Sequence, residues 1–94
     1  MDNQHTQISG YRDLTQEEID LMNEAKRVEA EVLAFHRRVQ DHLTYQSMDG
    51  DEEVERQKES RAFRWMAVAR GDIETGFMAL VRCIAQPMPI KLDE

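Results

Sequence analysis

Apolar residues recur along most of this chain at alternating steps of three and four, which is the spacing of one face of an α-helix. The first stripe is heptad-like and comprises Leu21, Ala25, Val28, Val32, Phe35, Val39 and His42. The second stripe comprises Val54, Ala62, Trp65, Ala69, Ile73, Phe77, Leu80 and Ile84. The pattern therefore predicts two long helices that face each other.

Local signals indicate where these helices begin and end. Thr15 followed by Glu18 is the pattern of a capping box, with Leu14 and Ile19 in the positions of a hydrophobic staple. The segment SMDGD supplies turn residues, and Pro87 ends the second helix. We expect one domain over residues 1–94, with an arm at 1–14, a helix at about 15–46, a turn at 47–51, a helix at about 51–85 and a tail at 86–94.

The second stripe is interrupted by polar residues between Arg56 and Arg61, so the first two turns of that helix are expected to be exposed or frayed. Each helix has about 30 residues and a length of roughly 45 Å. An isolated hairpin of this kind has a seam but hardly a core. A further apolar set lies off the second stripe, namely Phe63, Met66, Val68, Met78, Val81 and Cys83. The fold class predicted is all-α, an antiparallel two-helix hairpin with an N-terminal arm, whose surplus apolar face requires an obligate homo-oligomer.

Charge and composition limit the possible partners. A net charge of −7 argues against a general binder of DNA or RNA polymers, although a small anion in a local pocket remains possible. No apolar run approaches the roughly 18 residues of a membrane span, and the N-terminus lacks a signal-peptide core. The single cysteine, Cys83, cannot form an internal disulfide and is expected to be a buried small hydrophobe. We expect an intracellular protein without a membrane partner.

Residues suited to catalysis are scarce. His36 and His42 are six positions apart and do not share a helix face as a metal-binding pair would. The sequence contains no phosphate-binding glycine loop, no nucleophile elbow and no HExxH motif. We therefore predict that the protein is not an enzyme and has no catalytic residue, metal site or cofactor.

The better candidates concern anion binding. Tyr11 precedes the first helix and offers a ring on which a base could stack, while Lys26 is a point charge suited to phosphate. Their Cα atoms can be roughly 20 Å apart in one chain, a separation that an antiparallel neighbour could bridge. The alternative is that Tyr11 packs as a structural lid and Lys26 is a solvated charge.

Four residues of the second helix complete the candidate set. Arg61 and Arg64 share a helix face, and Arg70 lies near Thr75. Each arginine taken singly is more often a solvated surface residue than a ligand contact. Gly71 and Gly76 inside a helix indicate either close helix packing or the close approach of a ligand.

Two segments, ISGYRDLTQEEIDLMNEAK and WMAVARGDIETGFMALVRCIAQP, resemble the phage anti-CBASS cyclic-oligonucleotide sponges. The helical-hairpin domain of that family is shared with phage inhibitors of Thoeris signalling. The resemblance covers nearly the whole chain, with residues 7–26 and 65–87 as its specific parts. It implies a homo-hexamer of hairpins that sequesters cyclic di- and trinucleotides in the infected bacterium without cleaving them.

The resemblance also implies where these ligands bind. The tyrosine and lysine of the cyclic dinucleotide pocket fall on Tyr11 and Lys26, in a pocket between paired protomers. Arg70 and Thr75 are the best matches for a separate cyclic trinucleotide pocket near the three-fold axes. Gly71 departs from the threonine that many relatives have at this position. The rival hypothesis is a small phage helical module that binds a host protein through its exposed apolar face.

Overall fold

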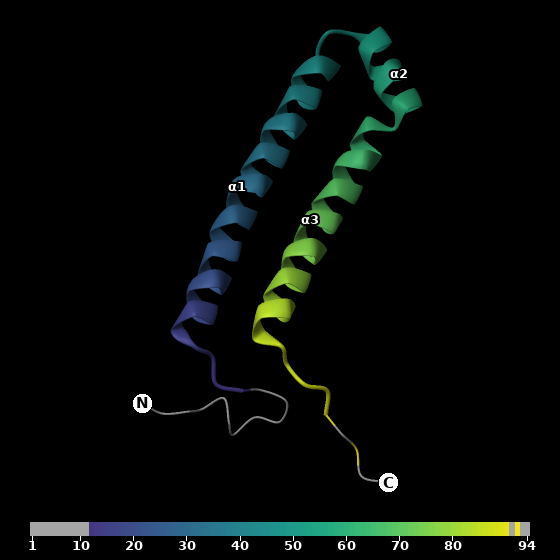
Figure 1. The fold of residues 1–94 in the computed structure, drawn as a ribbon. Helices are drawn as coiled ribbons and strands as arrows, with labels where there is room; N and C mark the ends of the chain where they lie inside the picture. The colour runs from purple at the N-terminus through teal and green to yellow at the C-terminus, as the bar shows by residue number, and fades with distance from the viewer. Residues whose placement is uncertain (1–11, 91, 93–94) are drawn as a thin grey trace.

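The computed structural model describes residues 12–90 and 92, and Tyr11 therefore lies outside the described residues. Three helices follow one another, α1 (Gln16–Ser47), α2 (Asp51–Ser60) and α3 (Ala62–Ala85). Helices α1 and α3 run antiparallel, side by side, and α2 closes the turn between them (Figure 1). The described part of the chain contains no strand. The prediction of an all-helical hairpin is confirmed.

The capping box at the start of α1 is present. Thr15 Oγ1 accepts a hydrogen bond from the backbone N–H of Glu18 at 3.1 Å, and Glu18 Oε1 accepts one from the N–H of Thr15 at 2.8 Å. Each side chain thus satisfies a donor that the helix start would otherwise leave without a partner.

The second half of the hairpin differs from the prediction of one helix over about 51–85. It is divided at Arg61, which adopts a left-handed conformation with φ 58° and ψ 38°. Gln57 of α2 is buried, and its amide donates to Leu43 O at 2.9 Å and to Gln46 Oε1 at 3.0 Å. The polar residues before Arg61 offer no apolar stripe to continue the seam with α1. Because the chain bends at Arg61, α2 packs against the last turns of α1 through Gln57.

The seam between α1 and α3 is rotated relative to the predicted stripes. Leu21, Phe35, Trp65 and Leu80 were expected to face inward, but each is between 45% and 61% exposed. His42 and Cys83 are exposed as well. The seam keeps a seven-residue repeat, but at these positions it takes the next residue along the chain, namely Met22, His36, Met66 and Val81. Met66 and Val81, which were assigned to the surplus face, are only half-exposed and lie with the seam positions of α3.

His36 takes the central position of the seam. It is 8% exposed, and its Nε2 lies 2.7 Å from the carbonyl oxygen of Met66, to which it donates a hydrogen bond. Burial of this imidazole is therefore compatible with its polarity, because the buried nitrogen has a partner.

The described residues include no fully buried apolar side chain. The radius of gyration of 20.2 Å is well above the roughly 12 Å expected for a globular chain of this length. The hairpin is thus one layer thick and leaves large apolar groups in solvent, among them Phe35, Trp65 and Met78. Exposure on this scale supports the expectation that other chains cover the surface.

Candidate functional site

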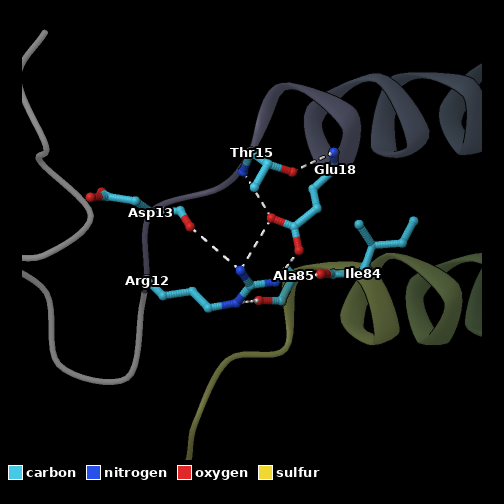
Figure 2. Close-up of polar contacts among 6 residues, drawn as sticks. All are labelled: Arg12, Asp13, Thr15, Glu18, Ile84 and Ala85. Carbon is cyan, nitrogen blue, oxygen red and sulfur yellow. Dashed lines mark hydrogen bonds and ion pairs between the residues drawn. The ribbon is translucent and has the colours of Figure 1, made fainter.

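Arg12 fastens the two ends of the hairpin together where the chain enters α1 (Figure 2). Its guanidinium donates to the carbonyl oxygens of Ala85 at 3.1 Å and Ile84 at 2.9 Å, at the C-terminus of α3. The same group forms a two-point ion pair with Glu18 in the first turn of α1. These contacts of Arg12 with Glu18 and with the end of α3 are called the clip below.

Glu18 is strongly stabilised in its charged form by this clip. Its hydrogen bonds from Arg12, followed by those from the backbone and side chain of Thr15, lower the pKa of the carboxyl to about 2. A carboxyl with a lowered pKa stabilises the fold above its unfolded pKa and loses that contribution as the pH falls through its folded pKa.

We expect the melting temperature of the protein to fall as the pH decreases from about 4.5 to about 2, the interval between the two pKa values of Glu18. The Glu18→Gln variant should have a lower melting temperature than the wild type near neutral pH. Its melting temperature should then fall less than that of the wild type across that pH interval. Circular dichroism melts at a series of pH values measure both effects. The matched control is Glu17→Gln, at the exposed neighbouring position, and an identical pH profile for both variants would contradict the role of the clip.

Lys26 lies in a groove between α1 and α3, toward the open end of the hairpin. This Lys26 groove has a volume of about 570 Å³. Its lining comprises Met22, Lys26, Glu29, Thr75, Phe77, Met78, Ala79, Val81, Arg82, Ala85 and Pro87. Two cations, a hydroxyl and an apolar wall therefore meet in one place.

The charges of the Lys26 groove favour an anionic ligand. Within the described residues, neither Lys26 nor Arg82 has a carboxylate within 4.0 Å, whereas the other lining charge is the single carboxylate of Glu29. Lysine and arginine without a protein counter-ion are suited to phosphate, and the apolar wall is suited to a base or sugar.

Arg70 lies apart from this groove. It lines a second groove, also of about 570 Å³, with Arg37, Gln40 and Asp41 of α1 among its other members. Its Nε is 3.4 Å from Glu74 Oε2. Within one chain, Lys26 and Thr75 therefore line the same groove, although the sequence analysis assigns them to different pockets. Arg70 lines a different groove. A shared site for Arg70 and Thr75 requires a second chain and stays a prediction.

Sequence comparison bears on this geometry. Residues 3–85 match the hairpin domain of the Acb2/Tad1 family. The matched range contains all three helices and the positions of Tyr11, Lys26, Arg70 and Thr75. The chain belongs to this family. A similar protein is Anti-CBASS protein 2 of Pseudomonas phage JBD67, which is 42% identical over an alignment 105 positions long that covers 93% of this chain and 97% of the relative. The resemblance inferred from the two sequence segments is confirmed.

Within this Acb2/Tad1 hairpin, Arg82 is the groove residue that sequence reasoning missed. It follows Thr75 by seven residues, which places both on the same side of α3 two turns apart. That spacing was a usable signal, but Arg82 sits within an apolar stretch and no local motif marks it.

Several features of the hairpin have no part in the Lys26 groove. A Cβ atom at Gly71 or Gly76 would meet nothing within 4 Å, so neither glycine is required by packing inside one chain. Among residues 12–90 and 92, no cluster of three His, Cys, Asp or Glu side chains could hold a metal ion. None of the helices in that part of the chain is long and apolar enough to cross a membrane.

Proposed function

We propose that the protein counters CBASS defence by binding and sequestering cyclic di- and trinucleotide signals without cleaving them. The observation that carries the proposal is the Lys26 groove, in which two cations without a carboxylate partner among residues 12–90 and 92 lie beside an apolar wall. This groove occurs in a chain that is 42% identical to a protein named for its action against CBASS.

The groove suggests a role for each of its polar residues. Lys26 and Arg82 would contact phosphate, and Thr75 would donate its hydroxyl to a phosphate or ribose oxygen. Phe77 and Met78 would cover one face of the ligand. Tyr11 of a paired protomer would stack on a base, in the manner that the family resemblance implies. The complete dinucleotide pocket is therefore formed by two chains within a homo-hexamer.

Sequestration fits the groove better than catalysis. Hydrolysis of a phosphodiester needs a positioned general acid and base or bound metal ions. Glu29 is the one carboxylate that lines the groove, and no histidine or cysteine of the described chain joins it. We propose that the protein is not an enzyme and uses no cofactor.

Cellular location follows from this role. A protein that removes a signal made by a bacterial immune synthase must act in the cytoplasm of the infected host. Its partners are then cyclic nucleotides and copies of itself, rather than a membrane or a nucleic-acid polymer.

One observation favours a second candidate function. Phe35 and Trp65 are 57% and 61% exposed in the single chain, and such a surface could bind a host protein. A phage module of this kind would not retain cyclic nucleotides.

The deciding experiment incubates the protein with a panel of cyclic di- and trinucleotides, removes free ligand, and releases bound ligand by heating. Sequestration predicts that intact ligand is recovered in stoichiometric amount, as measured by mass spectrometry. Recovery of linear products would indicate an enzyme, and failure to retain any member of the panel would favour the host-protein module.

Replacing Arg70 should separate the two ligand classes. Arg70→Ala is expected to abolish cyclic trinucleotide binding and to spare cyclic dinucleotides, because Arg70 does not line the Lys26 groove. Isothermal titration with one ligand of each class measures this. The control is Arg37→Ala, which removes a second cation from the groove that contains Arg70. Equal loss of both ligands in Arg70→Ala would mean that the substitution damages the fold.

A further inference from the structure

A third groove lies at the other end of the hairpin, around the bend between α2 and α3. This turn-end groove has a volume of about 460 Å³. It is lined by Ser47, Val54, Gln57, Lys58, Arg61, Phe63 and Arg64. Its volume lies within the range of about 300–1,000 Å³ that is typical of small-molecule sites.

The charge of the turn-end groove is opposite to that of the whole chain. Its lining contains three cations and no carboxylate, although the chain carries a net charge of −7. Lys58 is 3.4 Å from Glu55, in a pair whose side chains are both more than 60% exposed and which is therefore weak. Arg61 and Arg64 have no carboxylate within 4.0 Å among the described residues. Two guanidinium groups are thus available to an external anion.

The backbone at Arg61 is unusual for this residue type. Arg61 has φ 58°, a conformation that residues other than glycine, asparagine and aspartate rarely adopt. It is the C-cap of α2, a position where helices commonly end in the left-handed conformation. Here the bend places Arg61 and the first residues of α3 beside α2, so that side chains from both helices line one groove.

The rest of the groove lining combines a buried amide with apolar surface. Gln57 is 4% exposed and is held by its bonds to Leu43 and Gln46, so α2 is fixed against the end of α1. Val54 and Phe63 supply apolar surface, and the Phe63 side chain is 45% exposed and accessible to a flat ring.

We propose that the turn-end groove is a further, separate anion-binding site, which takes a linear nucleotide through its terminal phosphate. A terminal phosphate carries up to two charges and three free oxygens, which match the paired donors of Arg61 and Arg64. The base then lies against Phe63 and Val54. A cyclic dinucleotide has no such terminal group, so the turn-end groove and the Lys26 groove differ in the kind of phosphate that they recognise.

The test uses 5′-AMP as the probe, with adenosine as the analogue that lacks the phosphate, in isothermal titration of the intact protein. The informative variant is Arg61→Gly combined with Arg64→Gln. Glycine adopts positive φ readily, so the bend is preserved while both charges are removed. Gln86→Gly is the matched control, because Gln86 also has positive φ but lies at the far end of α3.

We expect wild-type protein to bind 5′-AMP and to bind adenosine at least about tenfold more weakly, as the loss of a charge-assisted contact predicts. The double variant should bind 5′-AMP about ten- to a hundredfold more weakly, whereas Gln86→Gly and Lys26→Ala should bind it as the wild type does. Equal affinity of the wild type and the double variant for 5′-AMP would overturn the proposal. So would loss of binding in Lys26→Ala, which would place 5′-AMP in the Lys26 groove.

Cyclic dinucleotide affinity is measured on the same variants. A protein that retains cyclic ligands but not 5′-AMP overturns only the turn-end site. A protein that binds 5′-AMP at the turn-end groove but retains no cyclic ligand overturns only the proposed sequestration.

Discussion

Tyr11→Ala and Lys26→Ala should each weaken binding of a cyclic dinucleotide by about one to two orders of magnitude. Loss of a stacked ring costs roughly 1–3 kcal/mol per base, and loss of a charge-assisted contact to phosphate costs about 1.5–3 kcal/mol. A pocket on a two-fold axis holds two tyrosines, so the loss of binding free energy for a symmetric ligand should be roughly doubled in Tyr11→Ala. Lys26 lines its groove without a protein counter-ion among the described residues, and its removal therefore leaves no buried charge behind.

The measurement is isothermal titration together with a thermal melt on each single variant. Arg27→Ala is the matched control, because Arg27 adjoins Lys26 on α1, is 65% exposed and does not line the groove. Neither Tyr11→Ala nor Lys26→Ala should lower the melting temperature by more than the control does. Unchanged affinity in both variants would leave Tyr11 as a structural lid and Lys26 as a solvated charge, and a large drop in melting temperature would favour the same interpretation.

In solution the assembly should have about six times the 11.0 kDa mass of the chain, and Trp65→Asp should dissociate it. The Trp65 side chain is 61% exposed in one hairpin, so only contact with another chain can bury it. Removal of a buried tryptophan costs about 3–5 kcal/mol, and a charge in its place adds a desolvation cost in every protomer. Light scattering at micromolar concentration measures the mass.

Phe77→Ala is the contrasting variant, which should affect the hairpin as well as the assembly. Phe77 is half-buried against α1 within one chain, so its removal should weaken the hairpin and the assembly together. Met48→Asp is the control for placing a charge at an exposed apolar position, since Met48 is 73% exposed in the turn. A monomeric wild-type protein, or a Trp65→Asp variant with unchanged mass, would contradict the predicted hexamer.

The sequence predicted those features that depend on neighbouring residues. The start of α1 could be read from Thr15 and Glu18 because both halves of a capping box lie within one turn. The turn that follows α1 was marked by its glycine and aspartates. Helical class followed from periodicity, which is insensitive to small errors in register.

Features that depend on contacts between helices were harder to predict from the sequence. Hydrophobicity favours the stripe that contains Phe35. The seam instead contains His36, because its imidazole donates a hydrogen bond to the carbonyl oxygen of Met66 in the opposite helix. The break at Arg61 carries no glycine to signal positive φ, and only the interrupted stripe indicated a change there. Lys26 could be named as a phosphate candidate from its charge, and the family resemblance implied the same residue, whereas Arg82 became evident only when α3 was placed beside α1.

The hydrogen bond between His36 and Met66 has a consequence for the alignment of the two long helices. Apolar seams repeat, so two antiparallel helices can in principle slide past each other by one heptad, or about 10 Å, and still bury similar surface. A slip by one heptad would break the bond from His36 to Met66 and move the buried imidazole to another part of α3, where it would need a different carbonyl within reach. The bond therefore favours the observed alignment of α1 along α3. In this alignment Lys26, ten residues from His36 toward the open end, lines the same groove as Arg82.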